Sequence, residues 1–330
     1  MKVLIFEYIT GGGFNKQALP DGLVQEGQLM LDALLTCFAE LHTMQVQVML
    51  DSRLTHCFCN DNIDIVQITP EHNCAESFAK LVQQADAVWP IAPEFEGILQ
   101  RLCEQVEAFG KRLLNASSVA VALAGNKYLT YQRLLQHHIP TVPTELLETA
   151  HCQPGDWIIK RIDGAGCADS FIVSHPQVFD YSLQSTQQFI IQPHIAGRTC
   201  SLSCLFQHGQ AWLLSVNLQH FQRVNQHYQL QAIHVNYCAD THVYTNLVTT
   251  IACAMPELWG YVGIDLIETA EQIRVLEINP RLTTSFTGLQ EARGLNIAEL
   301  VLGLQHGSPT IKPTRQNIHL ITVNSHDTAS

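Results

Sequence analysis

The chain has 330 residues, of which 46% are hydrophobic and 15% charged, and its formal net charge is −12. A chain of this length exceeds what one hydrophobic core usually serves, so two or three subdomains are expected. The acidic balance and the lack of a Lys/Arg cluster exclude an extended nucleic-acid surface. An anionic ligand would therefore need a local basic site.

The sequence does not indicate secretion or a membrane span. The first residues, 1–7, are too short for a signal-peptide core, and no run reaches about 18 apolar residues. Eleven cysteines without a secretion signal indicate reduced thiols in a cytoplasmic protein. His56, Cys57 and Cys59 could hold a metal, but without a Cys-x-x-Cys pair ordinary thiols are the simpler interpretation.

Residues 1–115 alternate between strand and helix patterns. This alternation predicts an α/β, Rossmann-like domain with a mostly parallel sheet and helices on both faces. The expected strands are residues 3–8, 46–51, 86–91 and 112–115, and the expected helices are residues 25–41 and 95–109.

Three glycines follow the first expected strand. Position 16 is Lys, so they do not form Gly-x-Gly-x-x-Gly, and they do not form a P-loop. Backbone amides at Gly12 and Gly13 could approach a substrate, or the glycines could simply form a tight strand–helix turn.

Residues 116–192 are expected to form a small α+β unit. A helix should begin at residues 125–127 and end near residue 138, before Pro140. The positive charge of Lys127 at the start of that helix is unfavourable with the helix dipole, so helix stability does not explain a lysine at this position. A solvated surface lysine is the alternative interpretation.

Lys160 lies in the middle of an apolar strand, and a glycine-rich loop follows it. A lysine in such a strand needs an anion to offset its lost hydration, and either a nucleotide phosphate or a structural carboxylate would serve. The loop contains Gly164, Ala165 and Gly166, whose small side chains would let backbone N–H groups close over phosphates. A plain hairpin turn is the alternative.

Residues 192–195 connect this unit to the C-terminal part, residues 193–330. An extended linker through Gln192, His194 and Ile195 could present main-chain groups to an adenine edge, or it could be only a connector. Beyond it, strands are expected at residues 200–206, 212–217, 228–235 and 318–323, and helices at residues 241–255 and 296–304.

Residues 260–281 are expected to form a hairpin with a polar face. A turn centred on residue 271 sets Asp265 opposite Glu277, and Asn279 shares the face of Glu277. The other face would bury four apolar residues, namely Ile264, Leu266, Leu276 and Ile278.

The two facing carboxylates of this hairpin should repel each other. Bound Mg²⁺ (or Mn²⁺) would remove the repulsion, because such ions take oxygen ligands. Without metal, Glu277→Gln is then expected to stabilise the protein. An ordinary half-exposed hairpin is the alternative interpretation.

In this order, the two lysines, the glycine loop, the linker and the hairpin resemble the ATP-grasp superfamily across essentially the whole chain. More narrowly, residues 6–13, 160–167 and 277–286 look like the tyramine–glutamate ligase group, which acts in methanofuran-type cofactor synthesis. The resemblance implies an N-terminal pre-ATP-grasp domain, a central lid and a C-terminal subdomain with the metal site.

The resemblance also implies roles for individual residues. The implied ATP contacts are Lys127 and Lys160 on the phosphates, residues Gly164, Ala165, Gly166 and Cys167 in the phosphate-covering loop, and Gln192, His194 and Ile195 on adenine. The implied metal ligands are Asp265, Glu277 and Asn279. Arg281 would steady the transferring phosphoryl group, and the acceptor substrate would approach Thr283, Thr284 and Ser285.

The sequence departs from the family at two points. Pro193 stands where an acidic residue is common, which removes one N–H donor from the linker. Arg198 either faces a substrate carboxylate or is a surface arginine.

The implied reaction is ATP-dependent ligation of a carboxylate and an amine through an acyl phosphate, releasing ADP and phosphate. The substrates would be glutamate and tyramine or similar small molecules. His194, His220 and His234 are candidate bases with no distinguishing pattern. A ligase with another amino acid, a non-catalytic ATP-binding regulator and a dinucleotide-dependent oxidoreductase are the alternatives. The oligomeric state stays open between monomer and homodimer.

Overall fold

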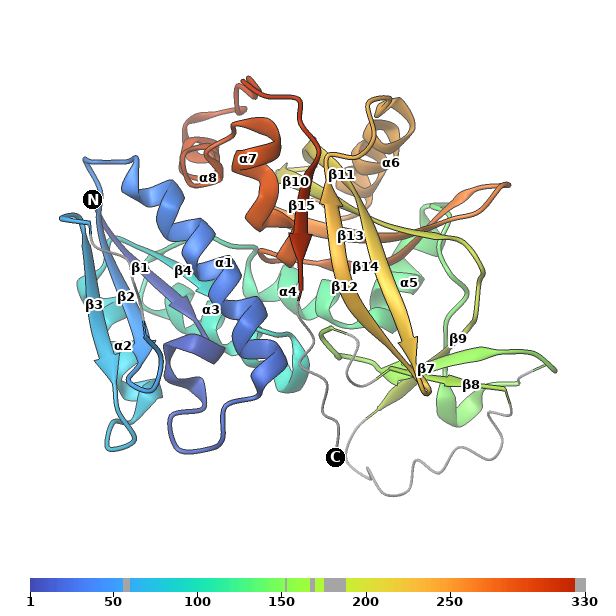
Figure 1. Cartoon of the computed structure of the whole chain (residues 1–330), viewed down its shortest axis with the longest axis horizontal. Helices are drawn as coiled ribbons and strands as arrows, with labels where there is room; N and C mark the ends of the chain where they lie inside the picture. The colour runs from blue at the N-terminus through green and yellow to red at the C-terminus, as the bar shows by residue number, and fades with distance from the viewer. Residues whose placement is uncertain (56–59, 152, 167–169, 175–187, 324–330) are drawn as a thin grey trace.

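The computed structural model describes residues 1–55, 60–151, 153–166, 170–174 and 188–323. These residues form three sheets of five, six and four strands (Figure 1). The sequence-based expectations for His56, Cys57, Cys59 and Cys167 lie outside the described residues. No helix in the described ranges is long and apolar enough to cross a membrane.

The N-terminal sheet is parallel, with strand order β3-β2-β1-β4-β5. Its strands are β1 (Lys2–Glu7), β2 (Gln45–Asp51), β3 (Ile63–Ile68), β4 (Ala87–Ile91) and β5 (Arg112–Leu113). Its helices are α1 (Asp21–Ala39), α2 (Cys74–Gln84) and α3 (Ile98–Ala108). The expected α/β organisation is confirmed, whereas β3 and α2 were not predicted.

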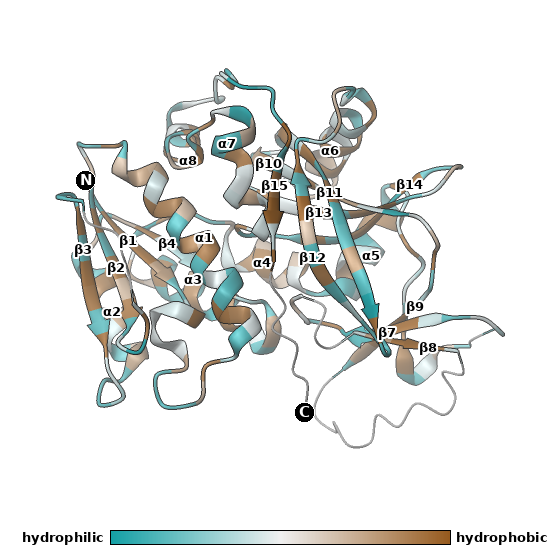
Figure 2. Cartoon of the chain, in the orientation of Figure 1, coloured by the Kyte–Doolittle hydropathy of each residue, from teal (hydrophilic) through white to brown (hydrophobic). Residues whose placement is uncertain are grey.

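Strand β1 shows why this sheet is buried on both faces. Val3 and Ile5 pack in the core that includes α1, whereas Leu4 and Phe6 pack in the core that includes α2. Parallel strands covered on both sides are continuously apolar, and in Figure 2 the strands of this sheet are mostly brown.

The six-stranded sheet is antiparallel, with strand order β14-β13-β10-β11-β12-β15. Its strands are β10 (Arg198–Gln207), β11 (Gln210–Val224), β12 (His227–Val235), β13 (Gly260–Glu268), β14 (Ile273–Asn279) and β15 (His319–Thr322). Helices α4 (Ser118–Gly125), α5 (Lys127–Gln136) and α6 (His242–Ala254) share one core with it. Helices α7 (Leu289–Arg293) and α8 (Ile297–Gly303) share another core with it and with α1.

The small sheet has the order β6-β9-β7-β8. Its strands are β6 (Glu145–Leu146), β7 (Trp157–Arg161), β8 (Ser170–Val173) and β9 (Phe189–Pro193). Ile159, Phe189 and Ile191 form its core. The sheet meets the β11–β12 hairpin where the Ile172 N–H donates to the Gln226 carbonyl at 2.8 Å. This contact joins the strand pair that carries Lys160 to the large sheet (Figure 1).

Candidate active site

The hairpin of β13 and β14 places Asp265 opposite Glu277 and Gly263 opposite Asn279, which confirms the expected pairing. The register then shifts after Asp265, so that Leu266 pairs with Val275. This bulge reverses the alternation of side chains beyond it. Val275 is therefore buried and Leu276 is only half-buried, so the expectation that Leu276 packs in the core was wrong.

Lys127, Lys160 and Glu277 meet in a largely buried group. The Glu277 Oε2 atom lies 3.1 Å from Lys127 Nζ and 3.7 Å from Lys160 Nζ. The side chains are only 8%, 9% and 17% exposed, respectively. The solvated-lysine interpretation of Lys127 was therefore wrong. Of the two anions considered for Lys160, a carboxylate partner is present, and it is Glu277.

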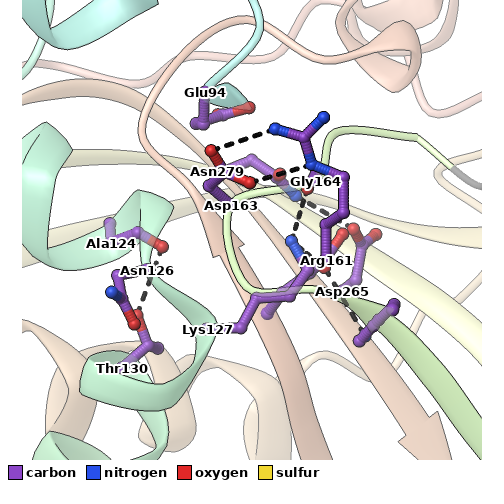
Figure 3. A network of polar contacts seen from close by, with 12 residues as sticks. Glu94, Ala124, Asn126, Lys127, Thr130, Arg161, Asp163, Gly164, Asp265 and Asn279 are labelled. Atoms are coloured by element: carbon purple, nitrogen blue, oxygen red, sulfur yellow. Dashed lines mark hydrogen bonds and ion pairs between the residues drawn. The ribbon is translucent and has the colours of Figure 1, made fainter. Parts of the chain in front are cut away.

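Three different elements supply this group. Lys127 is the first residue of α5, where the Asn126 side chain caps the helix by accepting hydrogen bonds from the N–H groups of residues 128 and 129. Lys160 comes from β7 and Glu277 from β14. Figure 3 shows Lys127, Gly164 and Asp265 close together. The site therefore forms only when the small sheet, α5 and the large sheet are packed against one another.

The pKa values of the two carboxyl groups of the hairpin are shifted in opposite directions. Burial by itself raises the pKa of Glu277, but the two lysine charges outweigh it and hold this pKa well below its usual range. Burial and the neighbouring Glu277 charge raise the pKa of Asp265. Asp265 accepts hydrogen bonds from Gln219 Nε2 at 3.0 Å and Asn279 Nδ2 at 2.9 Å. The destabilised carboxylate is therefore Asp265, and the expected gain of stability from Glu277→Gln is replaced by an expected loss.

The glycine loop lies against the start of α5. Lys127 Nζ donates to the Gly164 carbonyl, and the Lys127 N–H donates to the Ile162 carbonyl at 2.9 Å. Asp163 is held by Arg161, with Nε and Oδ1 3.1 Å apart (Figure 3). Its Oδ2 atom also accepts a hydrogen bond from the Glu96 N–H at 2.7 Å. Gly166 has a φ of +69°, a conformation that favours glycine. These contacts place Gly164 beside the lysine group.

Arg281 makes a two-point ion pair with Glu94, which sequence reasoning missed. Nε lies 2.9 Å from Oε1, and Nη2 donates to Oε2 at 3.0 Å. Burial alone lowers the pKa of Arg281, but the charges of Glu94, Glu26 and Glu277 together raise it, so the guanidinium stays charged. Glu94 follows β4 at the carboxyl edge of the parallel sheet. Ligands often bind at that edge, so this position could have marked Glu94 as a candidate site residue from the sequence.

Residues 283–285 lie directly after Arg281 and are hydrogen-bonded to neighbouring elements. Thr284 Oγ1 donates to Glu26 Oε2 at 2.7 Å. Thr283 Oγ1 lies 3.2 Å from the Tyr261 hydroxyl, and Ser285 Oγ lies 3.2 Å from Ser201 Oγ. The three hydroxyls thus follow Arg281 in a fixed arrangement.

The linker into the C-terminal part is held by specific contacts. Gln192 is buried and donates from Nε2 to Thr144 Oγ1 at 2.8 Å. The His194 N–H donates to the Asp156 carbonyl at 2.9 Å, and the His194 ring lies 2.8 Å from the Tyr228 hydroxyl. Within the linker, an adenine contact would therefore use main-chain carbonyls or the Ile195 N–H.

The structure does not bring Arg198 to the lysine group. Arg198 pairs with Glu268, with Nε and Oε2 2.8 Å apart. Glu268 is three residues from Asp265 on β13, so the two side chains point to opposite faces of the sheet. The Arg198 side chain is 58% exposed, consistent with the surface-arginine alternative.

Gly12 and Gly13 are explained by packing within the N-terminal domain. Gly12 has a φ of +101°, and a Cβ there would lie 2.5 Å from the Ile68 side chain. A Cβ on Gly13 would lie 2.5 Å from the Tyr8 ring. These close approaches fit the alternative of a tight turn after the first strand.

The oxygen donors of the hairpin suit a hard cation. Asp265, Glu277 and Asn279 offer two carboxylates and one amide oxygen, the ligand type that Mg²⁺ takes. No three His, Cys, Asp or Glu side chains are grouped to hold a metal anywhere in the ranges the structure describes, and the third donor of the hairpin set is the amide of Asn279. His220 and His234 contact each other at 2.7 Å on exposed strands, which does not distinguish either as a base.

Comparisons with known proteins identify two family domains and a related enzyme. The ATP-grasp domain model matches residues 124–285, and the pre ATP-grasp 3 domain model matches residues 44–121. Tyramine–L-glutamate ligase of Methanocaldococcus jannaschii is 28% identical over 302 residues, covering 91% of this chain and 88% of that protein.

Two solved structures show the same fold. An ATP-grasp superfamily protein from Archaeoglobus fulgidus has a TM-score of 0.70 at 23% identity, with 98% of this chain and 100% of that chain covered. The biotin carboxylase domain of Hydrogenobacter thermophilus 2-oxoglutarate carboxylase, solved with MgADP, has a TM-score of 0.71 at 15% identity, with 96% and 71% covered. With a pre-ATP-grasp domain followed by an ATP-grasp domain, the chain belongs to the ATP-grasp superfamily.

Proposed function

We propose that this protein is a carboxylate–amine ligase that activates its acid substrate as an acyl phosphate. The observation that carries the proposal is the convergence of Lys127 and Lys160 on Glu277, beside Asp265. Two buried cations next to two carboxylates form a site suited to phosphates with a bound cation.

The ATP phosphates would lie between the lysines and the glycine loop. Lys127 and Lys160 would neutralise phosphate oxygens, and the residues beginning at Gly164 would cover them with backbone N–H groups. The linker at His194 and Ile195 would hold adenine through its main chain. Mg²⁺ (or Mn²⁺), held by Asp265, Glu277 and Asn279, would supply positive charge to the phosphate oxygens.

The chemistry requires positioning and charge neutralisation rather than a protein nucleophile. The acid carboxylate attacks the γ-phosphorus, the bond to the ADP oxygen breaks, and an acyl phosphate forms. The neutral amine then attacks the acyl carbon, loses a proton, and phosphate leaves. Arg281 would face the transferring phosphoryl group, where negative charge is spread over the equatorial oxygens.

We propose glutamate as the acid and tyramine or a similar primary amine as the acceptor. This assignment is supported by the name of the Methanocaldococcus jannaschii relative. Thr283, Thr284 and Ser285 follow Arg281 and would contact the acceptor side of the site. Because one edge of Arg281 is occupied by Glu94, Arg281 would serve the phosphoryl group rather than a substrate carboxylate.

The test supplies glutamate, tyramine and Mg-ATP together, and then each pair separately. The expected result is a γ-glutamyl amide detected by mass spectrometry, with one ADP released per amide formed. ADP formed only with another acid or amine would remove the substrate assignment and keep the ligase assignment. AMP and pyrophosphate as products would contradict the acyl-phosphate route.

A further inference from the structure

The loop between β4 and α3 reaches from the N-terminal domain into the proposed phosphate site. Glu94 of this loop is buried, with 5% of its side chain exposed, and pairs with Arg281, 187 residues away in the sequence. A buried carboxylate at this position is costly unless a cation offsets it. Arg281 is the cation that offsets the charge of Glu94 here.

The pairing determines which part of Arg281 can meet a ligand. A guanidinium group has five N–H donors in one plane. Glu94 lies along the Nε/Nη2 edge: Nη2 donates a hydrogen bond to Oε2 at 3.0 Å, and Nε lies 2.9 Å from Oε1 as an ion-pair contact without hydrogen-bond geometry. Nη1 also donates to the Leu282 carbonyl at 3.1 Å. The hydrogen bonds to Glu94 and to the Leu282 carbonyl hold the guanidinium in one orientation and leave N–H groups along its Nη1/Nη2 edge for a ligand.

The loop that carries Glu94 is itself held from two sides. Gly125, at the end of α4, has no side chain, and a Cβ there would lie 3.2 Å from Glu94 Cβ. On the other side, the Glu96 N–H donates to Asp163 Oδ2 at 2.7 Å, next to Gly164. Glu94 therefore has little freedom to move relative to the glycine loop.

We propose that Glu94 is a positioning residue that aligns the Nη1/Nη2 edge of Arg281 with the γ-phosphate of ATP. This inference rests on the proposed function, because the γ-phosphate contact of Arg281 belongs to it. Glu94 itself does not touch ATP or the reacting atoms. The N-terminal domain thereby contributes to phosphoryl transfer through one side chain, in addition to any part it has in the substrate pocket.

The first test measures nucleotide binding by calorimetry, in Mg²⁺ buffer and without acid or amine. The variant Glu94→Asp keeps the charge but withdraws the carboxylate by one methylene, so it removes the alignment alone. We expect AMP-PNP to bind about tenfold more weakly than to the wild type, since a charge-assisted contact is lost. ADP affinity should change less than twofold, because ADP lacks the γ-phosphate.

The second variant is Glu94→Gln, which keeps the size of the side chain and removes its charge. Under the proposed reaction, both variants should lower kcat about 10- to 100-fold, because misplacement of a contact group acts on the chemical step. The KM for ATP should rise in line with the weaker binding of AMP-PNP, since ATP carries the same γ-phosphate. The matched control is Glu257→Gln, which breaks another Arg–Glu pair, 3.1 Å long, between Glu257 and Arg133. The control should leave both nucleotide affinities and kcat within twofold of the wild type.

Equal losses of AMP-PNP and ADP affinity in Glu94→Asp would overturn the inference, because they would indicate a general structural role. Unchanged affinity and kcat in both Glu94 variants would also overturn it. Wild-type protein that binds neither nucleotide would contradict the proposed function and this inference together. Failure to form the glutamyl amide, with the AMP-PNP effect intact, would contradict the proposed substrates alone.

Discussion

The two faces of the six-stranded sheet are formed by the same strands but bury different kinds of side chain. On one face, Leu202 and Ile264 are fully buried in the core that also contains Ile251 of α6. On the other face, Asn217 is also fully buried, and its Nδ2 donates to Ser201 Oγ at 3.3 Å and Ser203 Oγ at 3.2 Å. One face contributes stability through apolar burial. The other face combines an apolar part, which packs against α7 and α8, with these hydrogen-bonded polar groups, which stabilise the fold little.

The comparison teaches where function is located in this fold. Ser201 pairs with Asp265 across β10 and β13, so the polar face leads directly to the lysine group. Buried hydrogen-bonded side chains fix positions more than they add free energy of folding. Substitutions on the polar face should therefore affect ligand binding and turnover, whereas substitutions on the apolar face should affect unfolding.

The largest effect is expected from Glu277→Gln on the polar face. This change removes the charge that Lys127 and Lys160 share and one oxygen ligand of the proposed metal site. We expect kcat to fall at least about a hundredfold, the scale seen when one charge-stabilising group is lost from an active site. Steady-state ADP release measures it, with melting curves to verify folding. Wild-type kcat in Mg²⁺ buffer would contradict the assignment of Glu277.

On the apolar face, Ile251→Ala should produce the opposite pattern. Ile251 is fully buried, so truncation leaves a cavity and should lower the free energy of unfolding by about 2–5 kcal/mol. Urea denaturation measures this loss. Below the transition, kcat should stay within about threefold of the wild type. A large loss of kcat in fully folded Ile251→Ala would contradict the expectation that substitutions on the apolar face affect stability and not turnover.

A smaller effect is expected from Lys160→Ala, which concerns ATP affinity. Lys160 is buried beside Glu277 and would contact a phosphate through a charge-assisted bond. Its loss should weaken ATP binding by about 1.5–3 kcal/mol, with the fold intact. Calorimetry with ATP and Mg²⁺ measures the loss, and Lys16→Ala, at an exposed lysine of the N-terminal domain, serves as a control. Equal ATP affinity in wild type and Lys160→Ala would contradict this role.

The smallest effect is a gain of stability in Asp265→Asn without metal. Because the pKa of Asp265 is raised in the folded protein, its ionisation favours the unfolded chain once the pH exceeds the usual aspartate value of about 4. Asparagine removes that penalty, so the variant should be about 1 kcal/mol more stable at pH 7. The difference should disappear near pH 3, where both side chains are neutral.

Glu277→Gln supplies the opposite sign in the same experiment. The pKa of Glu277 is lowered in the folded protein, so its ionised form adds stability above its unfolded pKa, and that stability is lost as the pH falls. The variant should be less stable than wild type at pH 7 in metal-free buffer. Thermal melting at several pH values with a chelator measures both variants. Identical signs would contradict the division of charge between the two carboxylates.

Local patterns in the sequence predicted much of the fold and part of the site. The alternating strand and helix patterns predicted the parallel sheet, and the position of the turn predicted the pairing of Asp265 with Glu277. The bulge next to this pair was not predicted, because an inserted residue leaves the hydrophobic pattern ambiguous. Val275 took the core position expected for Leu276 for that reason.

Contacts between distant segments could not be predicted in the same way. Glu94 and Arg281 come from different domains, and neither lies in a pattern that requires the other. The lysines were singled out because each conflicts with its local surroundings, yet their common partner, Glu277, emerges only from the packing of three elements. Charge pairs that form across domains leave no periodic signal in a single sequence.

The acyl-phosphate route is the central claim, and isotope transfer tests it most directly. Glutamate labelled with ¹⁸O in its carboxylates is incubated with the protein, tyramine and Mg-ATP, and the released phosphate is examined by ³¹P NMR. If the carboxylate attacks the γ-phosphorus, one ¹⁸O atom moves from glutamate into each inorganic phosphate. The predicted result is phosphate carrying a single ¹⁸O, with ADP as the other product. Unlabelled phosphate formed together with the amide would contradict the account.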